Sequence, residues 1–437
     1  MKINRRDLLK IGVTQLMLVA LPESSDASTY QTKTQTRLSI LQGATDESKT
    51  QFSVHHKVNI DLKIFIKDSK GNIWYADKSE VIEHKGLPEK ITKFFVSGLY
   101  LNETFELFVV NTETNSILDT REFKMLDPSL ERTKFALCSC MDERFHDPKI
   151  WQNLVAKSPD VIFFLGDFVY ADRGIKGPAN PHHLWKRFSE VRQTLEIFFT
   201  TRLIPILATW DDHDFGLNNA HSENFPYVLE SQKNFLSFFA QDEGHCANFE
   251  RGPGISSALK FNSQTFFLLD DRSFRKPKKS KNRYAHWGEN QEKWMLNVMK
   301  SNPGTFWLMN GTQVFPDMVL KESVAHNHPV QLKGLLKELK TISSKVIFAS
   351  GDVHYSEISQ IETEALGYET YEITSSSMHS KSIPGSPHVI SNPRRMIATG
   401  ARNFVIVESI DTHNGVQMKV TSYNSSGNIL FQKSLTV

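Results

Sequence analysis

The sequence contains few cysteines: only Cys138, Cys140 and Cys246 occur among its 437 residues. Three cysteines are too few for a disulfide framework, and because their number is odd, at least one thiol is not in an intramolecular disulfide. That thiol is available for another role, such as metal binding. Cys138 and Cys140 fall on a strand predicted at 134–140, where side chains two residues apart point to the same face, which disfavours a bridge between them. Cys140, at the predicted end of this strand, is the candidate metal ligand.

The sequence also lacks an excess of charge of one sign, since its formal net charge is +2 at pH 7. Proteins that bind nucleic acid or a membrane surface usually carry a basic excess or a polybasic block. The one locally basic segment is 276–283, which we interpret as a solvated loop; attraction of an anionic substrate is the alternative. We therefore expect no stable nucleic-acid or membrane partner.

The apolar run at 11–21, near the N-terminus, is too short to span a bilayer. It follows a charged region in which Arg5 and Arg6 precede Asp-Leu-Leu-Lys, which matches the twin-arginine export pattern; an ordinary Sec signal is the alternative. We expect residues 1–27 to be a signal peptide, and the twin-arginine (Tat) export machinery to be a partner. The mature protein is then expected to be periplasmic or secreted.

The composition that remains is that of a soluble globular protein, with 39% hydrophobic and 23% charged residues. A chain of 437 residues usually exceeds one core, so two domains are expected. Between residues 38 and 125, short strands such as 57–66 alternate apolar and polar residues and are separated by turn signals. This pattern predicts a small all-β sandwich domain of the fibronectin or immunoglobulin kind at 30–127.

Beyond Pro128, predicted strands alternate with predicted helices, which indicates an α/β domain at 130–437. The predicted helices are 148–157, 182–199, 226–241, 287–300 and 330–340. The predicted strands are 134–140, 161–165, 204–208, 265–269, 306–309 and 346–349. Each strand is followed by a polar cluster, and such clusters meet at the carboxyl edge of a parallel sheet.

These polar clusters contain the residue types that bind metal ions. The run at 161–165 is a buried strand, and Asp167 follows it where a short carboxylate projects into the binding crevice. A single Gly-Asp pair is usually only a turn, but metal-type ligands after six successive strands predict a polynuclear metal site. The clusters are Ser139–Asp142, Gly166–Tyr170, Trp210–Asn219, Asp270–Arg272, Asn310–Gln313 and Gly351–Glu357.

The order of these motifs resembles that of PhoD-like alkaline phosphatases, a branch of the calcineurin-like metallophosphoesterases, over nearly the whole chain. The most specific segments are Trp210-Asp211-Asp212-His213 and Gly351-Asp352-Val353-His354-Tyr355-Ser356-Glu357. The resemblance implies a metallophosphoesterase-type α/β sandwich preceded by the small β-sandwich. It also implies a small phosphoester substrate, and we expect a monomer.

The resemblance further implies a ferric ion and calcium ions, with Mn²⁺ or Zn²⁺ as alternatives. The implied ferric ligands are Cys140, Asp167, Tyr170 and His354. The implied calcium ligands are Asp212, Asn218 and Asp352, with Asp167 bridging. Thiolate and phenolate favour ferric ion, whereas carboxylates and amides suit calcium.

The resemblance assigns His213 to the phosphate and Arg272 to clamping it. The chemistry of phosphoester hydrolysis adds the expectation that a protonated His213 stabilises the leaving oxygen. Two residues depart from the family pattern: Cys138 offers a second thiol, and Asp271 stands where a threonine is expected.

The predicted function is hydrolysis of phosphate mono- and diesters by an alkaline phosphatase or phosphodiesterase. Two other classes are retained. A phospholipase-like enzyme would need an apolar lip, which the sequence does not display as an amphipathic stretch. A non-catalytic metal-binding module would not need His213 and Arg272.

Overall fold

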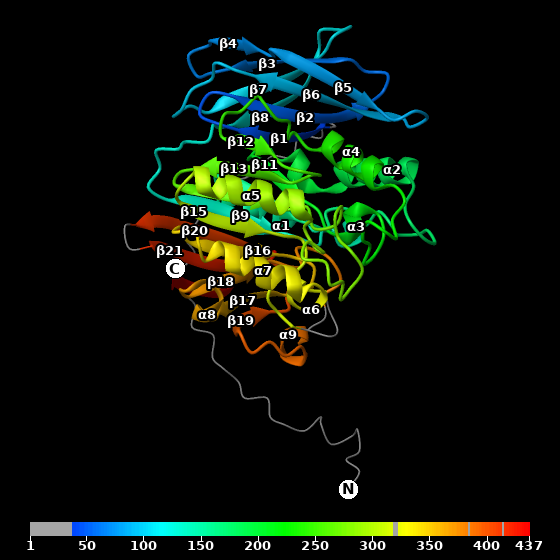
Figure 1. Cartoon of the computed structure of the whole chain (residues 1–437). Coiled ribbons are helices and arrows are strands. Elements are labelled where there is room, and N and C mark those ends of the chain that lie inside the picture. Colours follow the sequence, from blue (N-terminus) through cyan, green and yellow to red (C-terminus); the bar gives the residue numbers. More distant parts are fainter. Residues whose placement is uncertain (1–36, 318–321, 383–384, 413–414) are drawn as a thin grey trace, which may run out of the picture. The chain divides into compact units, whose positions relative to one another are not determined.

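The computed structural model describes residues 37–317, 322–382, 385–412 and 415–437. The predicted signal peptide at 1–27 lies outside these ranges. Residues Arg37–Val437 form one compact unit (Figure 1). None of the helices in the described part is long and apolar enough to cross a membrane.

The N-terminal part of this unit is a sandwich of two antiparallel sheets, as predicted. One sheet has the order β1(Ser39–Thr45), β2(Thr50–Lys57), β6(Glu89–Val96), β5(Lys78–Glu83). The other has the order β4(Ile73–Tyr75), β3(Leu62–Lys67), β7(Phe105–Asn111), β8(Ile117–Phe123). Strand β3 buries Leu62, Ile64 and Ile66 and exposes the lysines between and after them, because successive side chains point to opposite faces.

The larger part contains two sheets that face each other. The six-stranded sheet has the order β11(Ile206–Thr209), β10(Val161–Leu165), β9(Thr133–Cys138), β20(Phe404–Thr412), β21(Gly415–Tyr423), β22(Ile429–Thr436). The eight-stranded sheet has the order β12(Phe249–Arg251), β13(Ser257–Phe261), β14(Gln264–Leu268), β15(Thr305–Met309), β16(Val346–Ser350), β18(Thr370–Thr374), β17(Ser356–Ile361), β19(Arg395–Thr399).

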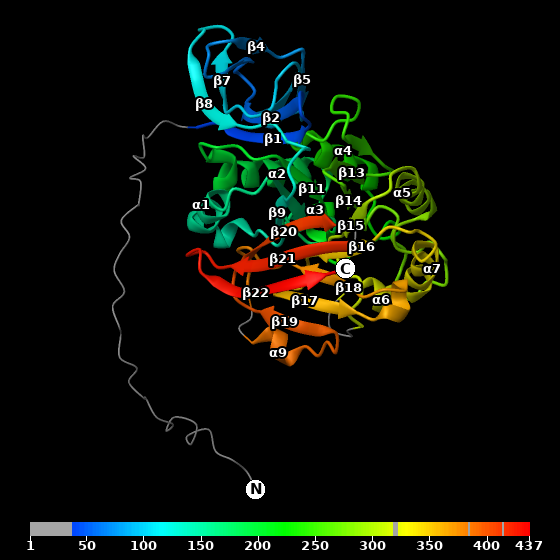
Figure 2. The same ribbon diagram turned by 90° about the vertical axis from the view of Figure 1, so that its left-hand side faces the viewer.

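Helices cover the outer face of each large sheet, which gives four layers (Figure 2). The first sheet is covered by α1(Pro148–Ala156), α2(Pro181–Thr194) and α4(Val228–Phe238), and the second by α5(Glu289–Ser301) and α7(Pro329–Leu339). Shorter helices are η2(Glu143–Phe145), η3(Glu196–Phe199), α3(Asp212–Phe215), α6(Val324–Asn327), α8(Thr363–Leu366) and α9(Ser386–Val389). Strand β9 shows the division: Phe135 and Leu137 enter the core between the sheets, whereas Ala136 and Cys138 face the helices.

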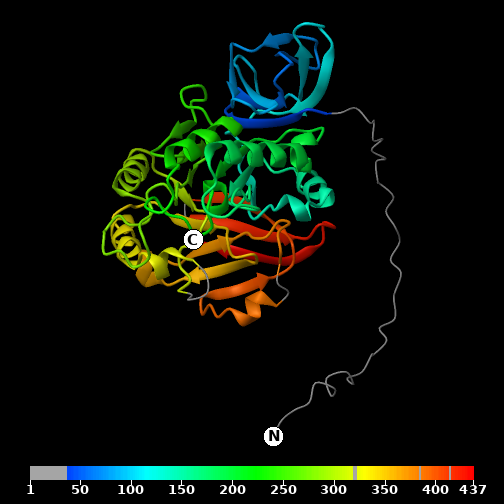
Figure 3. The same ribbon diagram turned by 90° about the vertical axis from the view of Figure 1, so that its right-hand side faces the viewer.

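The β-sandwich packs on the layer of α2 and α4, seen as blue strands over green helices in Figure 3. The fully buried Arg192 of α2 links the two parts, because its guanidinium donates to the carbonyl oxygens of Ser39 and Ser53, each at 3.0 Å, and of Phe238 at 2.8 Å. These three bonds tie α2 to strands β1 and β2 and to the end of α4.

The predicted α/β alternation is confirmed, with shifts at the ends of elements. The strand predicted at 161–165 matches β10 residue for residue. The helix predicted at 182–199 is two elements, since α2 ends at Thr194 and η3 follows. The strand predicted at 134–140 was too long, because β9 ends at Cys138 and Cys140 has a left-handed backbone with φ 57° that a strand does not accommodate.

Candidate metal centre

Chain segments that follow β9, β10, β11 and β16 bring potential metal ligands together. Strands β9, β10 and β11 are parallel neighbours, and β14, β15, β16 and β18 run parallel in the facing sheet, so their carboxyl ends lie at common edges. Ligand atoms lie within 4.8 Å of one another in three groups: Cys140, Asp167 and His354; Asp167, Asp212 and His213; and Asp167, Asp211 and Asp352. Asp167 belongs to all three, which is the position that a bridging carboxylate requires.

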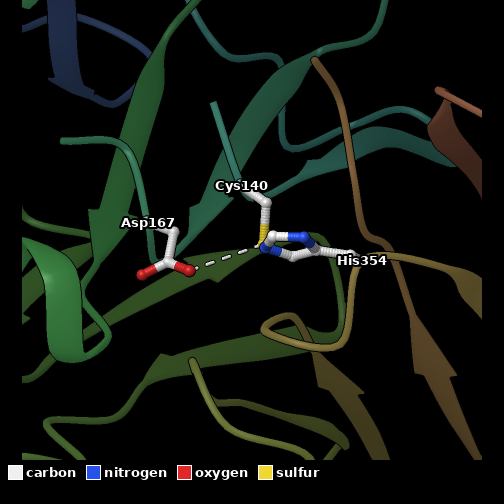
Figure 4. A group of neighbouring side chains, drawn as sticks. All are labelled: Cys140, Asp167 and His354. Carbon is white, nitrogen blue, oxygen red and sulfur yellow. Dashed lines mark hydrogen bonds between the residues drawn. The ribbon is translucent and has the colours of Figure 1, made fainter. Parts of the chain in front are cut away.

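The first group combines a thiol, a carboxylate and an imidazole (Figure 4). The Cys140 sulfur lies 3.6 Å from Oδ2 of Asp167. Nδ1 of His354 lies 2.9 Å from the carbonyl oxygen of Lys381, and a proton donated there leaves Nε2 with its lone pair. That Nε2 lies 3.3 Å from the Tyr170 hydroxyl, so the four predicted ferric ligands converge.

The environment of Tyr170 and Asp167 favours their protonated forms. Burial, together with the nearby Cys140 and Asp167, raises the pKa of Tyr170 well above its usual value. Burial likewise raises the pKa of Asp167. A bound cation compensates these charges and favours the phenolate and carboxylate forms that would ligate it.

The two neighbouring thiols differ in environment. Burial among helix side chains raises the pKa of Cys138 far above its usual value, and among the described residues no group of potential metal ligands includes it. Cys140 instead receives a hydrogen bond from the hydroxyl group of Ser376 at 3.1 Å, while the Ser139 hydroxyl, 3.4 Å from the sulfur, donates to the carbonyl oxygen of Ser375 at 2.8 Å. Hydroxyl donors favour a thiolate, so the geometry favours Cys140 over the competing Cys138.

Several candidate ligands have unusual backbone conformations. Cys140, Asp167, Asp352 and His354 all have positive φ, between 53° and 66°. Such conformations are costly for residues other than glycine and concentrate at functional sites. Gly351 permits the close approach of these segments, because a Cβ atom there would lie 2.4 Å from the carbonyl oxygen of Leu165.

His213 lies at the edge of the cluster with its ring positioned by a carboxylate. Its Nδ1 is 2.8 Å from Oδ1 of Asp172, and its ring centroid is 4.4 Å from that of Tyr170. Burial opposes the imidazolium, but the surrounding carboxylates, of which Asp212 is the strongest, raise the pKa of His213 to about 11. The surrounding carboxylates thus favour the imidazolium form, which can donate from Nε2.

Three aspartates outside the predicted ligand set also organise the site. Asp211 joins the third group, Asp172 holds His213, and Asp214 receives the backbone N–H groups of Asp167 at 2.5 Å, Val169 at 2.7 Å and Asp211 at 3.0 Å. Asp214 thus fixes the two ligand-bearing loops to each other. Asp211 and Asp214 flank the identified Asp212-His213 pair, which was the signal available in the sequence.

The described residues fit a cation. Oδ1 of Asp167 and Oδ2 of Asp211 are buried and have no hydrogen-bond partner within the described part of the chain. Buried carboxylate oxygens without a partner are costly unless a proton or cation compensates them. The thiol, phenol, imidazole and carboxylate donors are all residue types that bind metal ions in proteins.

Arg272 does not face an open site. It is completely buried, and its Nε donates to Asp211 at 2.6 Å and its Nη1 to Glu322 at 2.9 Å. Its Nη2 donates to Asp211 and to the hydroxyl of Thr312. All three nitrogens are engaged. This placement favours a role for Arg272 in positioning Asp211, rather than the predicted role of clamping the phosphate.

Asn218 lies on the exposed side of the loop after α3, where its backbone N–H donates to Asp172 at 2.8 Å. No described contact of its side chain identifies it as a ligand, so its assignment to calcium stays a prediction. Asp352 and Asp212 do lie within the ligand groups.

The chain folds as a sandwich of two large sheets covered by helices, with metal-type ligands gathered at the ends of its strands. Among solved structures, one described as "Structure of PhoD" has a TM-score of 0.65 at 14% sequence identity, and the alignment covers 91% of this chain and 91% of that chain. The chain therefore has a PhoD-like fold, which confirms the predicted architecture.

A second solved structure, a conserved uncharacterized protein (predicted phosphoesterase) from Streptococcus pneumoniae TIGR4, has a TM-score of 0.26 at 10% identity, with 71% of this chain and 100% of that chain covered. A similarity this low carries no argument about the fold. No protein-family model matches the sequence, and no curated protein matches it.

Proposed function

We propose that this chain is an exported, metal-dependent hydrolase that cleaves phosphate mono- and diesters. The observation that carries the proposal is the convergence of the three ligand groups on Asp167, with His213 at the edge of the second group. Phosphoester cleavage requires compensation of charge on the phosphoryl oxygens, a nucleophile at neutral pH and a proton for the leaving oxygen.

In this proposal Cys140, Asp167, Tyr170 and His354 hold a ferric ion. The calcium side is formed by Asp212, Asn218 and Asp352, and Mn²⁺ or Zn²⁺ are alternative occupants. Bound metal ions supply Lewis acidity, compensate phosphoryl charge and lower the pKa of water. We add Asp211 as a further candidate ligand through Oδ2, because Arg272 and Thr312 engage only Oδ1.

The residues of the chain perform the proton transfer and the positioning. Asp172 keeps the Nδ1–H of His213 engaged, so that the remaining N–H, on Nε2, is the proton available to a leaving oxygen. Asp214 holds the loops of Asp167 and Asp211 in register through three backbone N–H groups. Because these groups are fixed before substrate binds, little reorganisation is needed during the reaction.

The test combines elemental analysis of the purified protein with three substrates. Turnover of para-nitrophenyl phosphate and its bis ester that is lost with chelator and restored by metal supports the proposal. Cleavage of phosphatidylcholine with neither nitrophenyl ester turned over would support the phospholipase-like alternative. Tightly bound metal without turnover of any of the three would leave the non-catalytic metal-binding module.

Export is a separate part of the proposal and rests on Arg5 and Arg6 before the short apolar run. Replacing both arginines with lysines should retain the precursor in the cytoplasm. Immunoblots of cell fractions measure this, and export that continues but depends on Sec components would refute the twin-arginine assignment.

A further inference from the structure

Two arginines lie over one aromatic ring beside the metal centre. The guanidinium of Arg402 is 5.0 Å from the ring centroid of Phe145, and that of Arg144 is 5.5 Å from the same centroid. Phe145 ends η2, five residues after Cys140. We refer to Arg144, Phe145 and Arg402 as the arginine rim.

Backbone contacts connect the rim to the segments that carry ligands. Nε of Arg402 donates to the carbonyl oxygen of Ser380 at 3.2 Å. The residue before Ser380, His379, donates its N–H to the carbonyl oxygen of Cys140 at 3.4 Å, and the residue after it, Lys381, accepts from Nδ1 of His354 at 2.9 Å. The rim therefore lies next to the thiol and imidazole side of the centre.

The rim carries more positive charge than its neighbours compensate. Arg144 is bonded to Asp142, and Arg173 is shared between this carboxylate, at 2.8 Å, and that of Glu143, so the excess charge of the rim is that of Arg402. Within the described ranges, Arg402 has no carboxylate within ion-pair distance. The Arg144 side chain is 56% exposed, so its guanidinium is accessible from solvent.

We propose that the arginine rim binds a second anionic group of the substrate, a phosphate or carboxylate carried by the esterified alcohol. This inference rests on the proposed function, in which the metal centre holds the phosphate that is cleaved. Guanidinium groups bind such oxyanions through paired N–H donors. The hydrogen bonds of the two arginines go to Asp142 and Ser380. None of the three groups of potential metal ligands includes a residue of the rim.

The experiment compares three substrates built on the same three-carbon alcohol: glycerol 3-phosphate, glycerol 1,3-bisphosphate and 3-phosphoglycerate. kcat/KM is measured for each on the metal-loaded wild type and on Arg402→Gln and Arg144→Gln. The control is Arg132→Gln, because Arg132 is 57% exposed, pairs with Glu408 and precedes β9 at the end of the strand opposite Cys140. Binding of the same compounds is measured by titration calorimetry, which needs no turnover.

We expect the wild type to prefer at least one of the doubly anionic compounds, and each rim variant to reduce that preference about tenfold, mainly through KM. A preference for the bisphosphate alone identifies a phosphate subsite, and one for 3-phosphoglycerate alone identifies a carboxylate subsite. Equal kcat/KM and equal affinity for all three compounds in the wild type would overturn the assignment of the rim as an anion subsite. An equal loss of preference in Arg132→Gln would overturn it as well. If none of the three is hydrolysed but the bisphosphate binds more tightly than glycerol 3-phosphate through Arg402, the subsite stands and the hydrolase proposal fails.

Discussion

Replacing Arg272 with glutamine tests whether this residue positions Asp211 or clamps phosphate. The guanidinium is completely buried between Asp211 and Glu322, and these carboxylates outweigh burial and raise its pKa well above the usual value. Removing one partner of a buried ion pair costs about 3 to 5 kcal/mol. Because Arg275 stays 2.8 Å from Glu322, the loss falls mainly on Asp211, and we expect about 3 kcal/mol, the lower end of that range.

The assay is urea unfolding with and without bound metal. A cation on Oδ2 of Asp211 would compensate the carboxylate charge that loses its arginine partner. The variant should therefore lose less stability when metal is present than after chelation. Arg132→Gln is the control, because an exposed ion pair contributes only about 0 to 1 kcal/mol. Wild-type stability of Arg272→Gln in both conditions, combined with a raised KM for para-nitrophenyl phosphate, would refute the positioning role and restore the phosphate clamp.

Cys140→Ser should lose iron and any thiolate charge-transfer absorption, whereas Cys138→Ser should keep both; equal iron loss in the two variants would overturn the assignment. Asp212→Ala should lose metal, whereas His213→Ala should keep it and lower kcat by about two to four orders of magnitude, less on a nitrophenyl ester than on an alkyl ester because a nitrophenolate needs little protonation. Loss of metal from His213→Ala would instead make it a ligand. His379 is held neutral by burial, which lowers its pKa from 6.5 to about 4, and it accepts an indole N–H at 3.1 Å. Its neutral form therefore contributes stability that is complete above pH 6.5 and is lost as the pH falls towards 4, and urea unfolding across this range should show a shallower pH dependence in His379→Gln.

The sequence by itself determined the order of strands and helices and the positions of many candidate ligands. Buried strands such as 161–165 are apolar throughout, and a polar residue that follows one is brought to the carboxyl edge of a parallel sheet whatever the rest of the chain does. Asp167 and His354 were predictable for this reason. The alternation of apolar residues likewise predicted the β-sandwich, because it depends only on neighbours in the chain.

Only the tertiary structure decided what chemically identical residues do. Asp211, Asp212 and Asp214 are equivalent in the sequence, but at the start of α3 each side chain points in a different direction, towards Arg272, the ligand cluster and the backbone of the Asp167 loop. The left-handed backbone of Cys140 and the burial of Arg272 also depend on segments far away in the chain. Local pattern fixes where a polar residue leaves a strand, but the partner it meets is set by long-range packing, which no short stretch of sequence specifies.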